Sequence, residues 1–272
     1  MTKGAHSVAG VAVRKGREQA VTRALPDEVP VALVYNGSTQ AAMMATPDDL
    51  HDLALGFSLS EGIITDLTQI EKFEIVKHGQ GLEAQMWLSD DRADALAARR
   101  RFMAGPVGCG LCGIDSLDQA LRDLPAVTSD LTLAADDIPA AMAALRAAQP
   151  LHDQTRAVHA AGFYVAGQGI VAAREDVGRH NALDKVIGAM ARAGVSGAGG
   201  AIAITSRVSV EMVQKCAVAG APVLIAVSAP TSLAVQTALD AGITIAALAR
   251  DDAFEIFTHS ARIKTGATPH VA

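Results

Sequence analysis

The strongest constraint on the fold is an alternation of short apolar runs and helical patterns that begins at Ala160. Two strand-like runs first flank Gly167-Gln168-Gly169, and each later apolar run is followed by an amphipathic helical pattern. Such alternation predicts parallel strands with helices packed on the faces of their sheet. We expect strands at 160–165, 170–174, 200–205, 223–227 and 243–248, and helices at 181–193, 209–219 and 232–241.

The first half of the chain has a different pattern, typical of an α+β unit. Asn36-Gly37 separates two strand-like runs and predicts a hairpin turn. Thr46 can cap a following helix, in which Pro47 suits the first helical position. Further strands are expected at 70–77 and 82–88, and a further helix at 138–148.

These patterns predict an α/β protein in which a mixed sheet is flanked by helices and a smaller α+β part precedes it. We expect a loose N-terminal tail over residues 1–25, the α+β part over 26–150 and the α/β part over 151–272. The two larger parts can combine into one composite domain. The α/β part is the expected binding region, and the α+β part carries the cysteine segment.

Composition excludes several classes of protein. The formal net charge of −6 argues against nonspecific nucleic-acid binding, which needs a basic face. No apolar run reaches the ~18 residues of a membrane-spanning helix, and the N-terminus lacks a signal-peptide pattern, so we expect a cytoplasmic protein without membrane association. Three cysteines do not make a disulfide framework.

The most reactive pattern in the sequence is Gly108-Cys109-Gly110-Leu111-Cys112-Gly113. Its glycines predict a mobile loop with accessible backbone N–H groups. A helix expected to start near Asp115 would lower the pKa of a nearby thiol, and the thiolate is the nucleophile. Cys109 can then accept sulfur as a persulfide, while Cys112 stabilises the adduct or expels its outer sulfur by closing a disulfide.

Other interpretations of the cysteine pair remain open. A structural zinc site needs about four ligands, and a second C-x-x-C is absent. A thioredoxin-like site usually follows a strand, whereas a helix and Gly105-Pro106 precede this pair. The two cysteines can also be incidental. Cys216 lies mid-helix among apolar residues and is expected to be a core residue.

A charged segment, Arg174 to Asn181, lies between an expected strand and an expected helix. Asn181 can cap that helix, and Asp176 can accept hydrogen bonds from a guanine edge. The cations that can bind phosphate are Arg174, Arg179 and the following Lys185. His180 belongs to the same segment. A solvated charged turn is the alternative, and it is the commoner fate of such a run.

Two further loops each follow a strand and precede a helix. They carry Thr205, Ser206 and Arg207 in the first, and Ser228 and Thr231 in the second. If the strands are parallel, both loops lie at the carboxyl edge of the sheet, where open α/β sheets bind ligands. Ser and Thr are also ordinary helix caps, so either loop alone is weak support for a site. Together with the charged segment, they predict a phosphate or nucleotide site.

Several ordered segments resemble the FdhD family, the formate dehydrogenase accessory sulfurtransferases. The resemblance runs from about residue 31 to about residue 263. It rests on Asp52-Leu53-Ala54-Leu55-Gly56-Phe57, Ser60-Glu61-Gly62, Cys109-Gly110-Leu111-Cys112-Gly113, Arg174-Glu175-Asp176-Val177-Gly178-Arg179-His180-Asn181-Ala182, Thr205-Ser206-Arg207, Glu211-Met212-Val213-Gln214-Lys215 and Val227-Ser228-Ala229-Pro230-Thr231.

The resemblance implies a specific activity. Family members accept persulfide sulfur from a cysteine desulfurase on the C-x-x-C loop and transfer it to a bis(molybdopterin guanine dinucleotide) molybdenum cofactor. That cofactor, a bound substrate for which a GDP-like nucleotide is a surrogate, is then inserted into formate dehydrogenase. The alternative is a non-catalytic cofactor-binding chaperone whose cysteines bind zinc or are structural.

The resemblance also carries structural expectations. It implies a cytidine deaminase-like fold, a homodimer and no permanently bound metal. An H-x-E zinc signature is absent from the sequence, so deamination is not implied. A cofactor segment near the C-terminus maps onto Leu248, Ala249, Arg250, Asp251, Asp252 and Ala253.

Overall fold

The computed structural model describes residues 4–93, 96 and 123–266. Its largest sheet has the strand order β13-β12-β11-β10-β8-β9. β10, β11 and β12 are parallel, whereas β8, β9 and β13 each run antiparallel to their neighbours. The mixed sheet flanked by helices is therefore confirmed. Its strands are β8 (His159–Val165), β9 (Gly169–Asp176), β10 (Ala201–Ile204), β11 (Val223–Ala226), β12 (Thr244–Arg250) and β13 (Ala253–Ile256).

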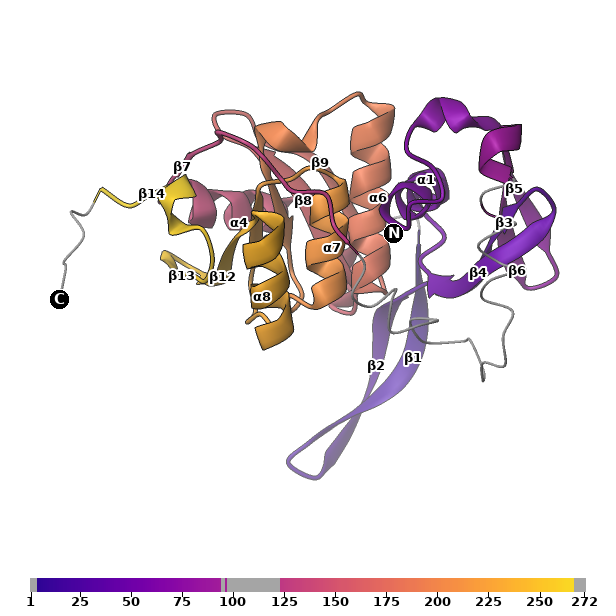
Figure 1. Ribbon diagram of the computed structural model, residues 1–272. Coiled ribbons are helices and arrows are strands. Elements are labelled where there is room, and N and C mark those ends of the chain that lie inside the picture. The colour runs from indigo at the N-terminus through magenta and orange to yellow at the C-terminus, as the bar shows by residue number, and fades with distance from the viewer. Residues whose placement is uncertain (1–3, 94–95, 97–122, 267–272) are drawn as a thin grey trace.

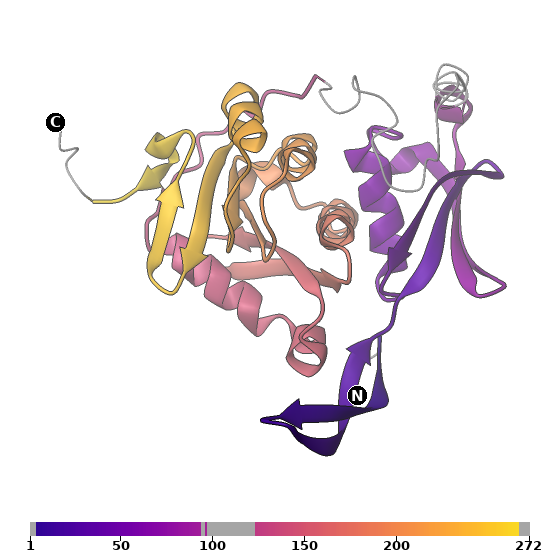
Figure 2. The same ribbon diagram turned by 90° about the horizontal axis from the view of Figure 1, so that it is seen from below.

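Helices cover both faces of this sheet, as Figure 2 shows. On one face α6 (Arg179–Arg192), α7 (Val210–Val218) and α8 (Ser232–Ala241) pack over alternate strand residues such as Ile202 and Leu224. On the other face α4 (Asp137–Ala147) packs over Ala203 and Ile225. Because both faces of the sheet are covered, successive side chains of these strands are all buried, which explains why their sequences are continuously apolar. Cys216 is fully buried in the first of these cores, as expected.

The smaller part contains a sheet of order β4-β3-β6-β5, covered by α1 (Leu50–Ser60). Asn36 and Gly37 both have positive φ and form the turn between β3 and β4, as predicted. α1 begins later than expected, with Asp49 rather than Thr46 as its N-cap. The strands are β3 (Val29–Tyr35), β4 (Ser38–Ala45), β5 (Ile70–His78) and β6 (Gly81–Leu88), and the short helix η1 (Leu67–Gln69) precedes β5.

The expectation of a loose tail over residues 1–25 is wrong. β1 (Ala5–Arg14) and β2 (Arg17–Pro26) form an antiparallel hairpin that projects from the body of the molecule (Figures 1 and 2). Lys15 and Gly16 both have positive φ, as a two-residue turn between twisted strands requires. The hairpin was missed because its apolar residues stay exposed: Val11 and Val13 are 63% and 65% accessible.

The packing boundary also lies earlier than residue 150. β7 (Leu133–Ala134) pairs with β14 (Ile263–Lys264), and α4 contributes Leu145 and Ile138 to the core beneath the large sheet. Val127 is buried against α8. Residues 127–147 therefore belong with the C-terminal part, because their apolar side chains lie in the cores formed against the large sheet. Short elements complete the fold: α5 (Pro150–Thr155), η2 (Gly197–Gly199) and η3 (Ser260–Arg262).

The two parts meet where α1 crosses α6. Figure 1 shows α1 end-on and α6 from the side, whereas Figure 2 shows α1 from the side and α6 end-on. Glycines allow this close contact. A Cβ atom on Gly56 would lie 1.7 Å from the carbonyl oxygen of Asp184, and one on Gly188 would lie 2.0 Å from that of Asp52. The helix backbones therefore touch directly.

Candidate functional site

The topology brings the predicted loops to one edge of the large sheet. The parallel strands β10, β11 and β12 end there. β8 runs antiparallel to β10, so His159 at its start lies at this edge. His159 in turn pairs with Asp176 at the end of β9. The loops 177–180, 205–209, 227–231 and 251–252 therefore share the carboxyl edge, which we call the loop edge.

Thr205, Ser206 and Arg207 follow β10, and only Arg207 among them is exposed. The Thr205 hydroxyl accepts a hydrogen bond from the backbone N–H of Ala160 at 2.9 Å, which ties this loop to β8. The Ser206 hydroxyl donates to the carbonyl oxygen of Arg207 at 3.0 Å. The two hydroxyls thus shape the loop, and the Arg207 guanidinium is its exposed cationic group.

The next two loops contribute exposed polar groups. The Thr231 hydroxyl accepts from the backbone N–H of Ala234 and caps α8, as its sequence position predicted. Ser228 is partly exposed beside it. Arg250 at the end of β12 is exposed, as are Asp251 and Asp252 in the turn after it, and Ala253 starts β13. Leu248 and Ala249 precede them at an irregularity in the β12–β13 pairing.

Asp176 is fully buried, and both of its carboxylate oxygens are engaged. Oδ2 lies 2.7 Å from Nζ of Lys185 and accepts a hydrogen bond from the Thr46 N–H. Oδ1 accepts from the Gly178 N–H at 2.8 Å and from the Asn181 amide at 2.9 Å. This position differs from the expectation that Asp176 meets a guanine edge, because its carboxylate is enclosed at the junction of the two parts.

Asn181 also serves the junction rather than the helix cap expected of it. α6 begins at Arg179 with Gly178 as its N-cap. The Asn181 amide donates to Asp176 and to the carbonyl oxygen of Met44, 2.9 Å away on β4. Asn181 is only 8% exposed. Its side chain therefore joins the end of β9 to the N-terminal sheet.

Arg174 is likewise held by the N-terminal part. Its Nε and terminal nitrogen donate to the same Asp52 oxygen at 2.8 and 2.6 Å, while Arg192 donates to the other oxygen at 2.6 Å. Asp52 is 1% exposed. A buried carboxylate that holds two arginines in this way fixes both guanidinium groups, so Arg174 is not free to follow a phosphate at the loop edge.

A further buried ion pair, between Lys215 on α7 and Asp184 on α6, lies at the junction and is hydrogen-bonded to Ser60 on α1. Nζ of Lys215 donates to both oxygens of Asp184, at 2.9 and 3.0 Å, and to the hydroxyl of Ser60 at 2.9 Å. Burial of the Asp184 carboxyl raises its pKa, which the Lys215 charge and the Ser60 hydrogen bond oppose. Removal of one member would leave the other charge buried without its partner.

Sequence reasoning missed these junction residues as a group. The available signal was a charged residue on the apolar face of an expected helix: Asp52 stands beside Leu53, and Asp184 and Lys185 follow Leu183. Such charges are buried only when they are paired. The contacts that join the two parts come from segments more than a hundred residues apart in the sequence, as Asp52 with Arg174 and Ser60 with Asp184 illustrate.

Arg179 and His180 remain at the loop edge, where α6 starts beside α7. Nε2 of His180 lies 3.6 Å from Oε2 of Glu211, and the same oxygen accepts a 2.6 Å hydrogen bond from Ser209. Nε of Arg179 and Nε2 of His180 are buried atoms that have no hydrogen-bond partner among the residues that the structure describes. Burial lowers the pKa of His180, and the adjacent Arg179 charge lowers it further.

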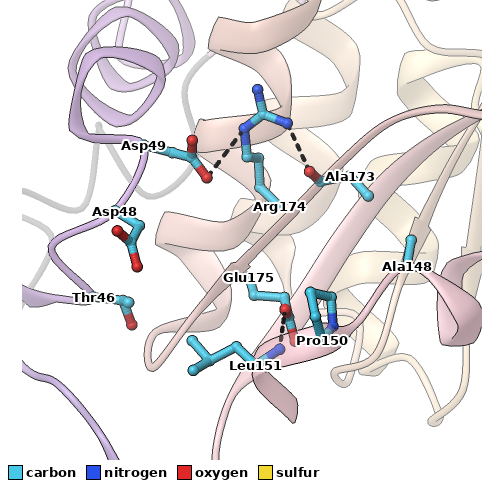
Figure 3. Close-up of a pocket in the computed structure, with 9 residues that line it drawn as sticks. All are labelled: Thr46, Asp48, Asp49, Ala148, Pro150, Leu151, Ala173, Arg174 and Glu175. Atoms are coloured by element: carbon cyan, nitrogen blue, oxygen red, sulfur yellow. Dashed lines mark hydrogen bonds and ion pairs between the residues drawn. The ribbon is translucent and has the colours of Figure 1, made fainter. Parts of the chain in front are cut away.

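A pocket of about 340 Å³ lies beside the junction rather than between the loops (Figure 3). Arg174 points toward Asp49 there, 3.4 Å away, and Glu175 accepts hydrogen bonds from the N–H groups of Leu151 and His152. Burial raises the pKa of Glu175 despite those hydrogen bonds. Carboxylates outnumber cations in its lining, which also includes Asp48, so it does not suit a phosphate.

Stability should depend on pH through His159 at the loop edge. Burial first, then the charge of Arg179, lowers its pKa, although Asp176 opposes them. The neutral ring therefore stabilises the fold above the unfolded pKa of about 6.5, and this contribution is lost as pH falls through the lower folded pKa. We expect the urea concentration at the unfolding midpoint to decrease as the pH is lowered from about 7.5 to about 5.5. The decrease should be smaller in His159→Gln.

The control for this prediction is His78→Gln, because the His78 side chain is 79% exposed at the end of β5. It should keep the full acid sensitivity of the original protein. Equal loss of stability on acidification in His159→Gln and in the original protein would contradict the prediction.

Cys109 and Cys112 lie outside the described residues. Among the residues that are described, no group of three or more His, Cys, Asp or Glu side chains is arranged to hold a metal. No helix in the described part of the chain is long and apolar enough to cross a membrane.

The fold and the loop edge define an α/β protein with polar loops gathered at the carboxyl ends of its parallel strands. The model of the FdhD/NarQ family matches residues 26–264. The chain therefore belongs to the FdhD/NarQ family, which confirms the resemblance found in the sequence.

Individual relatives agree over nearly the whole chain. The sulfur carrier protein FdhD of Agrobacterium fabrum is 57% identical over 257 residues, 94% of this chain and 95% of that protein. That of Brucella abortus is 54% identical over 246 residues, covering 90% and 91%. The crystal structure of a proposed formate dehydrogenase accessory protein from Desulfotalea psychrophila has a TM-score of 0.76 at 26% identity, covering 96% of this chain and 99% of that one.

Proposed function

We propose that this protein is a sulfurtransferase required for formate dehydrogenase activity. Cys109 and Cys112 would accept persulfide sulfur from a cysteine desulfurase and pass it to the molybdenum of a bis(molybdopterin guanine dinucleotide) cofactor. The observation that carries the proposal is the C-x-x-C pair inside the region matched by the family model, together with relatives named as sulfur carrier proteins.

The loop edge is the proposed place for the nucleotide part of this substrate. Exposed Arg207 and the start of α8 at Thr231 supply a cation and free helix N–H groups, which suit phosphate. Arg250 adds a second exposed cation on the same edge. The proposal includes the finer expectations of a cytidine deaminase-like large part, a homodimer and a cytoplasmic site of action.

Persulfide mapping tests the sulfur-carrying step. The purified protein is incubated with a cysteine desulfurase and free cysteine, then digested and analysed by mass spectrometry. We expect a gain of about 32 Da, one sulfur atom, on the peptide that carries Cys109 and Cys112. Stoichiometric zinc bound through both cysteines, with no mass gain, would contradict sulfur transfer and favour a cofactor-binding chaperone.

Calorimetry with GDP tests the nucleotide site. Arg207→Ala removes the exposed cation of its loop, so we expect GDP affinity to fall by about tenfold or more, the loss typical of a charged hydrogen bond. Arg23→Ala is the matched control, because Arg23 is exposed on the projecting hairpin. Equal GDP affinity in the original protein and in Arg207→Ala would place the phosphates elsewhere.

A further inference from the structure

The β1–β2 hairpin lacks the packing that the rest of the molecule has. It projects from the body (Figure 1), and its ten residue pairs follow one another without a bulge. Valines are exposed on both of its faces, Val11 and Val13 on one and Val8 on the other. A lone two-stranded hairpin is only marginally stable in water, so we expect a further chain to cover one this long.

The two edges of the hairpin differ in charge. In the described structure β1 pairs only with β2, which leaves its outer edge open. Between His6 and Arg14, β1 carries no charged side chain, whereas β2 carries Arg17, Glu18 and Arg23. Charges, prolines and bulges normally prevent an edge strand from pairing with another chain. β1 has none of them between its ends, so its edge can accept a further strand.

The tip of the hairpin is basic. Arg14, Lys15 and Arg17 surround the turn and are exposed, and within the described residues no ion pair involves them. With Arg23 and Glu18 they give the hairpin a formal charge of +3, in a chain whose total is −6. The hairpin is therefore complementary in charge to the rest of the molecule.

The acidic pocket at the junction lies beside the base of the same hairpin. Asp48 lines this pocket and lies against Gly4, since a Cβ atom on Gly4 would be 2.3 Å from its Oδ2 atom. Asp49 and Glu175 add two further carboxyl groups to the lining. Arg174, the cation among the described lining residues, is already bonded to a buried carboxylate. The pocket therefore has an excess of acidic groups.

We propose that two copies of this chain pair through the free edges of their β1 strands, so that the basic tip of each hairpin lies against the acidic pocket of the other. Two-fold symmetry requires an antiparallel pair whose opposite residues point to the same face. Such a pair is centred on one residue. Gly10 is the midpoint of the overlap between residues 6 and 14.

This register brings the charged surfaces together. Arg14 lies opposite His6 of the second copy, so Lys15 and the turn lie at the base of that hairpin. That base is where Gly4 meets Asp48 at the pocket. The tip cations thus gain carboxylate partners, while the two hairpins form one four-stranded sheet.

A second copy fits better than an unrelated partner because the match is reciprocal. In an isologous contact, the tip and the pocket must belong to the same chain and lie one hairpin length apart. Ten-residue strands span about 33 Å, and the pocket lies at the base of the hairpin. The inference rests on the homodimer of the proposed function and deepens it, because it assigns the contact surface and gives each pocket residues of the other copy.

Cysteine cross-linking of the full-length chain tests the register, in a background where Cys109 and Cys112 are replaced by serine. Gly10→Cys lies opposite its own copy, within the distance that a disulfide spans, so mild oxidation should give covalent dimers on a non-reducing gel. A Cβ atom on Gly10 meets only Val21, at 3.9 Å. Val13→Cys is the exposed control: its two copies would lie about 20 Å apart along the strands and should not cross-link.

Sedimentation of charge variants tests the contact between tip and pocket. Lys15→Glu, on an exposed turn, replaces attraction by repulsion twice in each dimer and should raise the dimer dissociation constant about tenfold or more. Asp48→Asn removes a carboxylate with little change of shape, so Lys15→Glu should have a smaller effect in that background. Lys77→Glu, exposed on β5, is the matched control and should leave dimerisation unchanged.

The outcomes separate this inference from the proposed function. Equal effects of Lys15→Glu with and without Asp48→Asn would overturn the contact with the pocket. Dimers in which Val13→Cys cross-links, or in which Gly10→Cys does not, would overturn the pairing of β1 and leave the homodimer standing. A monomer at every concentration tested would overturn the inference and the homodimer together. None of these results bears on the sulfur-carrying step, which persulfide mapping tests.

Discussion

Gly56→Ala should destabilise the protein by about 3 kcal/mol or more, although alanine is the better helix former. The added methyl group would lie 1.7 Å from the Asp184 carbonyl oxygen and 2.8 Å from the backbone nitrogen of Gly188. These are backbone atoms of a packed helix, so the strain cannot be relieved by a side-chain rotation. α1 must move away from α6 instead.

That displacement would weaken the ion pairs beside the contact. Asp52 on α1 bonds to Arg174 and Arg192, and Ser60 on α1 bonds to Asp184 and Lys215. Asp52 is buried, so stretching its bonds would leave its charge without its arginine partners, and the buried Asp184 and Lys215 would lose the Ser60 hydroxyl. Moving α1 away from α6 is therefore expected to disrupt the glycine contact and the ion pairs together.

Urea denaturation measures the effect, and Gly199→Ala is its control. A Cβ atom on Gly199 meets nothing within 4 Å, so this change should alter the free energy of unfolding by less than about 1 kcal/mol. An increase in stability on Gly56→Ala, as expected of an isolated helix, would show that the helices do not pack this closely.

Local patterns in the sequence predicted most of the fold. The runs that became β10, β11 and β12 were apolar throughout because both faces of their sheet are covered. Asn36-Gly37 predicted its turn for a stereochemical reason, since both residues need positive φ. The β1–β2 hairpin was not predicted because its valines are not buried. Its sequence therefore shows no contrast between a buried apolar face and an exposed polar face.

The loop edge was predictable from topology, but the role of each charged residue in it was not. Arg174, Arg179 and Asp176 stand in one short segment, yet Arg174 and Asp176 turn to the N-terminal part and Arg179 stays at the edge. Which part of the protein each charged side chain contacts depends on partners such as Asp52 and Thr46, which lie far away in the sequence. A sequence pattern gives the charge, whereas only packing tells whether that charge is already neutralised.

Replacement of Cys109 should have the largest effect on function. We expect Cys109→Ala to reduce sulfur transfer to sulfur-free formate dehydrogenase by more than about a hundredfold, because the thiolate that forms the persulfide is absent. In that step the Cys109 thiolate attacks the outer sulfur of the donor persulfide. A new S–S bond forms, the donor S–S bond breaks, and the donor cysteine leaves as a thiolate.

Cys112→Ala should keep sulfur loading and slow delivery. Cys112 stands nearer the helix start expected at Asp115, so it is expected to have the lower thiol pKa. A lower pKa gives more thiolate but also a weaker nucleophile and a better leaving group, which suits the helper rather than the carrier. Cys109 has glycine on both sides, so we expect its sulfur to be little shielded. Labelled sulfur separates the two steps: loading and delivery at the normal rate by Cys109→Ala, with no loading of Cys112→Ala, would reverse the assignment.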